Sequence, residues 1–216
     1  MSVKLSSLPT DIPIPEKYKP FADEYIATRM RYFRPVKTGE QLICIHGAGI
    51  PSAGKSTKLR DYVREHPEWK SHHFTLIGND DVMHSMPGYK KSFRKDWKEK
   101  SFEFFEKPAR AINYQLLREA VKSRVHLLFD HSATAEYRLN LLPELREHGY
   151  YLEMVYVHCW IEEAIRRAKI RVEKTGQYVP LEYIPDRFEI LQRLLPAYRG
   201  MVDTFVTLDN SAPEMS

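Results

Sequence analysis

The segment GIPSAGKS, from Gly49 to Ser56, constrains the fold of this chain most strongly, because it fits the pattern G-x-x-x-x-G-K-[ST] without adjustment. Glycines in such a loop let the backbone curl tightly, so that its amide groups point into one concavity that suits phosphate oxygens. The alternative is a chance match in an unrelated turn. The apolar run QLICIH at 41–46 and the helical pattern over 55–64 supply the flanking strand and helix, which favours a phosphate-binding loop, or P-loop.

A P-loop in this context predicts that the chain binds a nucleoside triphosphate, ATP or GTP, together with Mg²⁺. We expect Lys55 to reach the β- and γ-phosphates and the hydroxyl of Ser56 to bind the metal. The expected nucleotide-binding residues are Gly49, Ile50, Pro51, Ser52, Ala53, Gly54, Lys55, Ser56 and Thr57.

Short apolar runs alternate with helical patterns along the rest of the chain. The runs predict strands at 41–46, 74–78, 125–130, 151–159 and 204–208. The helical patterns cover 20–32, 55–64, 89–124 with a break at Pro108, a stretch ending near 148, 161–174 and 180–199. Strands that alternate with helices predict an α/β fold of the P-loop NTPase type, with a parallel β-sheet of about five strands covered by helices on both faces.

The length of 216 residues suggests one domain with a single sizeable core. Because the first residues are rich in proline, we expect residues 1–40 to form an extended arm and a helix. The P-loop kinase domain is expected over 41–211, with a lid region around 168–187, and 212–216 form a short tail.

The composition is that of a soluble protein of a reducing compartment. The formal charge of +4 suits an anionic ligand but is too small to indicate nucleic acid by itself. Cys44 and Cys159 lie in apolar runs and are expected to be buried thiols. The first 20 residues lack the apolar core of a signal peptide, and no apolar run approaches the ~18 residues of a membrane span. We therefore expect a cytoplasmic protein with no membrane partner.

Two carboxylates follow predicted strands, at the edge where an open parallel sheet binds its ligands. One of them, Asp80 or Asp81, follows the second strand in Asn79-Asp80-Asp81, where it could accept the proton of an attacking hydroxyl or only cap the next helix. Asp130 ends the third strand, where it could hold Mg²⁺ as a Walker B carboxylate or cap a helix. A base beside a P-loop favours a kinase over a hydrolase, a switch or a motor.

Arg167, Arg171 and Lys174 fall along one stripe of the helix after the fourth strand. Such a stripe could clamp a transferring phosphoryl group, and it could equally be a solvated basic face. Residues 89–110 pose a similar choice, because they hold eight Lys or Arg interleaved with aromatic rings. A nucleic-acid surface is one interpretation. Since Phe93 and Trp97 are four residues apart and Phe104 follows near the same face, we favour core packing with a basic rim.

From Leu42 to about Ser211 the chain resembles the zeta toxin family of small-molecule kinases. The matching segments are GIPSAGKST, IGNDDVMHSMPGY, HLLFDHSAT, GYYLEMVYVHC, AKIRVEKTGQYVP and LDNS. The resemblance implies phosphorylation of nucleotide sugars, UDP-N-acetylglucosamine above all, with ATP or GTP as donor. It also implies that Asp80 is the base, that Arg171 is the catalytic arginine, and that Ser132 contacts the acceptor. An antitoxin that blocks the nucleotide site is then a possible partner.

Two positions depart from the family pattern. Tyr114, with Gln115 beside it, stands where the family has an acidic acceptor contact, and Gln177 stands where it has a second lid arginine. These departures leave phosphotransfer intact and open the identity of the acceptor. The expected acceptor-binding residues are Asp81, Tyr114, Ser132 and Thr134, and the expected phosphate clamp is Arg167, Lys174 and Arg187. The alternatives are a kinase for a nucleoside, dinucleotide or polynucleotide end, and a nucleotide-binding regulator without catalysis.

Overall fold

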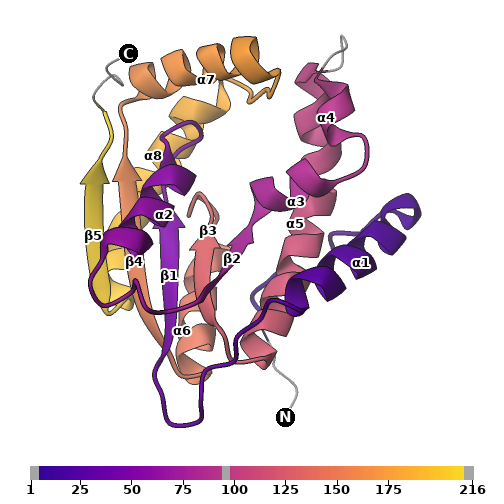
Figure 1. Ribbon diagram of the computed structural model, residues 1–216. Coiled ribbons are helices and arrows are strands. Elements are labelled where there is room, and N and C mark those ends of the chain that lie inside the picture. Colours follow the sequence, from indigo (N-terminus) through magenta and orange to yellow (C-terminus); the bar gives the residue numbers. More distant parts are fainter. Residues whose placement is uncertain (1–4, 94–97, 212–216) are drawn as a thin grey trace.

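The computed structural model describes residues 5–93 and 98–211, and its centre is one parallel five-stranded sheet in the order β2-β3-β1-β4-β5 (Figure 1). The strands are β1 (Leu42–Ala48), β2 (Phe74–Gly78), β3 (His126–Asp130), β4 (Tyr150–His158) and β5 (Thr204–Asp209). Every residue of β1 is buried, as expected for a central parallel strand that is covered on both faces. The predicted fold class is confirmed.

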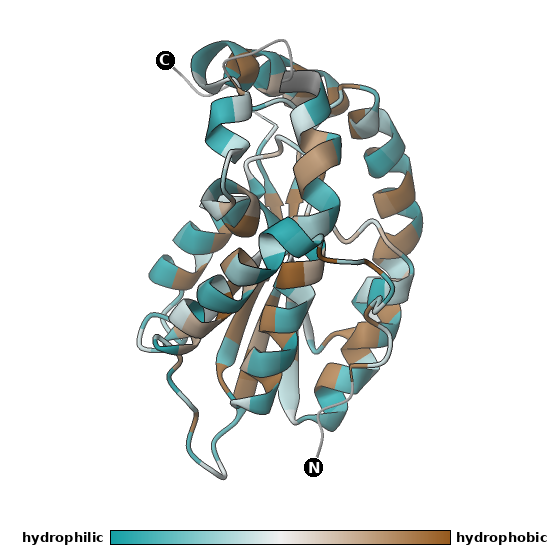
Figure 2. Ribbon diagram, turned by 90° about the vertical axis from the view of Figure 1, so that its right-hand side faces the viewer, coloured by the Kyte–Doolittle hydropathy of each residue, from teal (hydrophilic) through white to brown (hydrophobic). Residues whose placement is uncertain are grey.

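Helices cover both faces of the sheet. They are η1 (Glu16–Tyr18), α1 (Lys19–Met30), α2 (Lys55–Glu65), α3 (Asn79–Ser85), α4 (Tyr89–Ser92), α5 (Lys98–Lys122), α6 (Tyr137–Glu147), α7 (Ile161–Thr175) and α8 (Tyr183–Met201). Tyr62 of α2 donates a hydrogen bond to Glu153, while Gln192 of α8 donates to Tyr156 on the same strand. Because side chains three apart on a strand point to opposite faces, α2 and α8 lie on opposite sides. Apolar residues line the strands and the helix sides that face them (Figure 2).

A second, smaller core packs α1, α3, α4 and α5 together beside the sheet edge formed by β2. Val82 and Met83 of α3 and Phe105 of α5 are among its buried members. This core fixes the orientation of α3, whose first turn follows β2 directly. Aromatic rings of the 89–110 segment do pack into a core, as expected, since Phe105 is buried there. Phe104, which was expected on the buried face, is instead 43% exposed. Trp97 lies outside the described residues.

The expected helix break at Pro108 is wrong, because α5 continues through this residue as one helix of 25 residues. A proline inside a helix removes one backbone hydrogen bond and crowds the preceding turn. Here Pro108 is buried, and its neighbours Phe105 and Ala109 lie in the second core. The tertiary contacts on both sides of the proline therefore hold the helix together.

The arm before the P-loop domain packs onto the sheet layer. Leu5 and Leu8 are buried in the main core. The Ser7 backbone N–H donates to Glu144 of α6 at 3.0 Å, and Arg29 of α1 donates to the Leu76 carbonyl at the edge of the sheet. Cys44 and Cys159 are buried and not disulfide-bonded, as expected. Within the described ranges, no helix combines the length and apolar character needed to span a bilayer.

Candidate active site

The P-loop joins β1 to α2 at the carboxyl edge of the sheet. Ser52 and Gly54 adopt left-handed backbone conformations, with φ of 62° and 79°. The Ala53 N–H donates to the Ile50 carbonyl at 3.2 Å, which closes a tight turn. A Cβ atom added to Gly49 would lie 2.9 Å from the Val157 carbonyl oxygen, so this position requires glycine. The local sequence thus gives the curled loop that phosphate binding needs.

Asn210, just after β5, braces this loop. Its side-chain N–H donates to the Ala53 carbonyl at 2.9 Å, and its backbone N–H donates to the His158 carbonyl at 2.9 Å. A Cβ atom on Gly54 would lie 2.4 Å from Asn210 Nδ2. Asn210 could not be singled out from the sequence, although it lies within the LDNS segment that resembles the family.

Lys55 begins α2 and forms an ion pair with Asp130, the last residue of β3. Burial lowers the pKa of the Lys55 ammonium to about 8, the negative charge of Asp80 opposes this shift, and the nearby charges of Arg138 and Arg171 add to it. Three cations therefore gather at the P-loop, from α2, α6 and α7. Mutual repulsion of this kind is relieved by a bound polyanion such as a triphosphate.

Asp80 and Asp81 occupy the first turn of α3 but face different surroundings. The charge of Asp80 acts on Lys55 and on the buried hydroxyl of Tyr89. The charge of Asp81 instead acts on Tyr25 of α1. The structure thus brings Asp80 to the P-loop lysine and places the charge of Asp81 toward the second core.

The basic stripe of α7 divides into different roles. Arg171 donates to the side-chain oxygen of Gln177, so these two residues form one contact pair. Arg167 pairs with Glu163 at 2.7 Å and lies near Gly54, since a Cβ atom there would be 3.7 Å from its guanidinium. Lys174 is exposed. Arg187 lies on α8, with its guanidinium 5.5 Å from the ring centre of Tyr183.

The end of α7 meets the α4 region above the carboxyl ends of the strands (Figure 1). Gly176 ends α7 with φ of 75°, and a Cβ atom there would lie 2.7 Å from Cβ of Phe93. Burial raises the pKa of Tyr89, and the charge of Asp80 raises it further while that of Arg171 opposes. Tyr89 therefore lies within reach of the charges of both expected catalytic residues, which the Pro-Gly-Tyr sequence alone did not indicate.

The loop after β3 carries two of the expected acceptor contacts. The hydroxyls of Ser132 and Thr134 lie 2.8 Å apart. Tyr114, another expected contact, is 1% exposed, and its hydroxyl lies against that of Tyr137. The guanidinium of Arg138 donates to the same Tyr114 hydroxyl at 3.4 Å.

A series of buried hydrogen bonds supports the loop after β3. The Ala133 N–H donates to Nδ1 of His131 at 3.0 Å, so the other ring nitrogen of His131 carries the proton and donates to His46 at 3.2 Å. Nε2 of His46 then donates to the Cys44 sulfur at 3.2 Å. Burial, reinforced by the charge of Arg138, lowers the pKa of His46 to about 3 and that of His131 well below its usual value. Both rings are therefore neutral.

The chemistry of the donor set fits Mg²⁺. The Ser56 hydroxyl lies in the first turn of α2, and the Asp130 carboxylate ends the neighbouring strand β3. Such hard oxygen donors, completed by phosphate oxygens and water, are what Mg²⁺ prefers. Among the described residues, no cluster of three or more His, Cys, Asp or Glu side chains is arranged to hold a metal.

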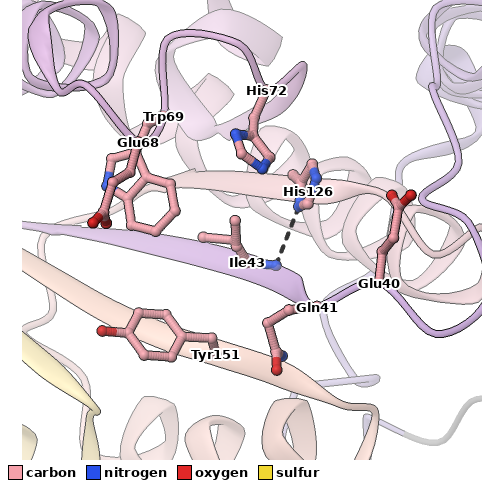
Figure 3. A pocket seen from close by; sticks show the side chains of 8 residues that line it. All are labelled: Glu40, Gln41, Ile43, Glu68, Trp69, His72, His126 and Tyr151. Carbon is pink, nitrogen blue, oxygen red and sulfur yellow. Dashed lines mark hydrogen bonds between the residues drawn. The ribbon is translucent and has the colours of Figure 1, made fainter.

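A groove of about 530 Å³ lies at the opposite edge of the sheet (Figure 3). It is bordered by the amino ends of β1, β3 and β4 and by Trp69 and His72. Within it, the Ile43 N–H donates to His126 at 3.2 Å. The P-loop follows the carboxyl end of β1. The groove is therefore remote from the candidate active site.

Comparison with known proteins agrees with this geometry. The family model described as zeta toxin matches residues 34–209. A structure from the PezAT chromosomal toxin-antitoxin system of the human pathogen Streptococcus pneumoniae has 16% identity and a TM-score of 0.66, covering 88% of this chain and 78% of that chain. A putative kinase from Chloroflexus aurantiacus has 14% identity and a TM-score of 0.54, covering 82% and 92%.

A third structure, described as AvrRxo1-ORF1:AvrRxo1-ORF2 with sulphate ions, has 11% identity and a TM-score of 0.54. The match covers 90% of this chain and 64% of that chain, so this chain spans less than two thirds of that protein's length. At these identities the solved structures show a shared fold. No curated protein matches the sequence significantly.

Proposed function

Because the chain belongs to the zeta toxin family of P-loop kinases, we propose that it transfers the γ-phosphoryl group of ATP or GTP to a small acceptor. The acceptor carries a hydroxyl and a nucleotide portion, as UDP-N-acetylglucosamine does. The protein acts in the cytoplasm, and an antitoxin that covers the nucleotide site is its proposed protein partner. The relative from Streptococcus pneumoniae belongs to a toxin-antitoxin system, which supports this partner class.

The observation that carries the proposal is the curled P-loop at the carboxyl edge of the sheet, where Lys55 pairs with Asp130. The charges of Asp80 and Arg171 both act on the pKa of Lys55, so both lie near it. The P-loop amides and Lys55 hold the β- and γ-phosphates. Asp80 accepts the proton of the acceptor hydroxyl as that oxygen attacks phosphorus. Arg171, with Arg167 beside Gly54, offsets the charge on the transferring group. Mg²⁺, held by Ser56 and Asp130, would neutralise phosphate charge.

A different acceptor is the second candidate, and two observations favour it. Tyr114 supplies a buried hydroxyl where the family pattern has a carboxylate, and Gln177 supplies an amide bonded to Arg171 where the pattern has an arginine. Lys55 and Asp80 themselves keep the family pattern. The acceptor is then a nucleoside, a dinucleotide or a polynucleotide end.

The test is phosphate transfer from labelled ATP or GTP, with Mg²⁺, to a panel of UDP-sugars, nucleosides, dinucleotides and 5′-hydroxyl oligonucleotides. Asp80→Asn serves as the control, because it removes the base and leaves the P-loop unchanged. Transfer to a UDP-sugar that is lost in the control supports the first proposal, and transfer to another compound reassigns the acceptor. Bound nucleotide without transfer to any compound would indicate a regulator or an acceptor outside the panel.

A further inference from the structure

Arg138, near the start of α6, has a charged side chain that the proposed reaction does not use. Its Nε and Nη1 atoms are buried, and within residues 5–93 and 98–211 they have no hydrogen-bond partner. Nη2 donates only to the Tyr114 hydroxyl, at 3.4 Å. None of the described carboxylates forms a salt bridge with this guanidinium. A buried charge without a counter-ion is costly to a folded protein, by several kcal/mol.

The aromatic side chains beside Arg138 are neutral, and two of them carry hydroxyls able to donate hydrogen bonds. The guanidinium lies 6.0 Å from the ring centre of Phe129 and 5.9 Å from that of Tyr137. The hydroxyl of Tyr198 is buried and, like two Arg138 nitrogens, has no partner in the described part of the chain. Burial raises the pKa of Tyr198, and the charge of Arg138 opposes the shift, so the two groups are close. Donors without acceptors thus converge here, which is the composition of an anion site.

The position of Arg138 in the fold indicates which anion this is. Asp80 and the Ser132–Thr134 loop follow β2 and β3, on one side of the P-loop, whereas Arg167 and Asn210 follow β4 and β5 on the other. Arg138 follows the Ser132–Thr134 loop and contacts Tyr114. It therefore belongs to the half of the site that holds the proposed base.

We propose that Arg138, with the hydroxyls of Tyr114 and Tyr198, binds a phosphate group of the acceptor and so selects phosphorylated acceptors over neutral ones. The inference rests on the proposed kinase function and adds the residue that recognises the charge of the acceptor. Arg138 is half-buried as a residue, so its side chain retains some exposure. The planar guanidinium offers paired N–H groups that match a phosphate better than a lysine would.

Inorganic phosphate is the first probe, and thermal unfolding of the whole protein is the readout. The Lys55→Ala background weakens the competing P-loop site. Phosphate should raise the melting temperature of Lys55→Ala and should have little effect on Lys55→Ala/Arg138→Gln. Arg138→Lys keeps the charge and should retain part of the effect. Arg146→Gln, on the same helix, breaks a surface ion pair with Asp203 and should leave the phosphate effect intact. Equal stabilisation by phosphate with and without Arg138 overturns the proposal.

Steady-state kinetics provides the second measurement. In Arg138→Gln, the KM for UDP-N-acetylglucosamine should rise about 10- to 100-fold, which corresponds to the loss of a hydrogen bond to a charged group. The KM for neutral N-acetylglucosamine should stay the same. An equal rise for both acceptors would assign Arg138 a structural role and reject the proposal. If no acceptor is phosphorylated, the kinase function fails, and the phosphate measurement still decides the role of Arg138.

Discussion

Acidification should destabilise this protein well above the pH at which its carboxylates protonate. His46 and His131 are 1% and 6% exposed and are linked in the chain that supports the Ser132–Thr134 loop. Burial is the main cause that lowers the pKa of both rings in the folded state, and the charge of Arg138 lowers it further. In the unfolded chain both recover an ordinary pKa near 6.5. The unfolded state therefore binds more protons as the pH falls below 6.5, and stability decreases in that direction.

The magnitude follows from the same difference. At pH 5 an ordinary histidine in the unfolded chain is almost fully protonated, while the pKa of folded His46 is about 3. Each of the two rings then costs about 2 kcal/mol of unfolding free energy relative to pH 8, or about 4 kcal/mol together. His126, whose pKa burial lowers to about 4, contributes with the same sign. Such a loss is a large fraction of the stability of a typical domain.

Urea unfolding followed by tryptophan fluorescence at pH 8, 7, 6 and 5 measures this dependence. His46→Asn should be less stable at pH 8 and should lose about 2 kcal/mol of the pH dependence, since one titrating ring is gone. His73→Asn is the control, because His73 is exposed and should give the same profile as the unchanged protein. An unfolding free energy that stays constant within about 1 kcal/mol from pH 8 to pH 5 would refute the reasoning.

Three further predictions concern the P-loop and Asp80. Lys55→Ala and Asp80→Asn should each reduce phosphate transfer about 100-fold or more, and near-normal turnover in either variant contradicts the assignment. Asp80→Asn should still bind nucleotide. Gly54→Ala forces a side chain into a left-handed conformation against Asn210 and should weaken nucleotide binding about tenfold, measured by titration with a fluorescent analogue. Gly39→Ala, also left-handed but with no atom nearby, is its control. Asn210→Ala should cost about 1 kcal/mol and speed amide exchange in residues 49–56, whereas Asn140→Ala, at an exposed site, should not.

Most of the fold could be predicted because its elements are encoded locally. The run at 125–130 becomes β3 at His126–Asp130, and the run at 41–46 becomes the start of β1. The helix break at Pro108 could not be judged in the same way. Proline opposes a helix through its own turn, whereas the second core that outweighs this effect is built from residues distant in sequence.

The residues of the candidate site likewise fall into those that a local sequence pattern indicates and those that only tertiary contacts reveal. Lys55 could be identified because it stands in a contiguous pattern beside a strand end. The same kind of pattern indicated a carboxylate at 80–81, and the family resemblance selected Asp80. Arg138, Tyr89 and His131 could not be identified, because their properties depend on which neighbours surround them. His46, within LICIHGA, reads as one polar residue in a strand, and only the pairing of β1 with β3 brings it to His131. Burial and charge balance are properties of the assembled sheet.

The bond from Asn210 to the Ala53 carbonyl has a consequence for biosynthesis. It joins the loop of the first strand to the residue that follows the last strand, 157 positions later in the chain. Translation proceeds from the amino end at about 5–20 residues per second. Asn210 is therefore synthesised roughly ten seconds or more after the P-loop that it bonds. A ribosome-bound chain shorter than about 210 residues has Lys55 and Asp80 but lacks this contact. Completion of the phosphate-binding loop is thereby tied to completion of the sheet, so that catalytic competence comes late in synthesis.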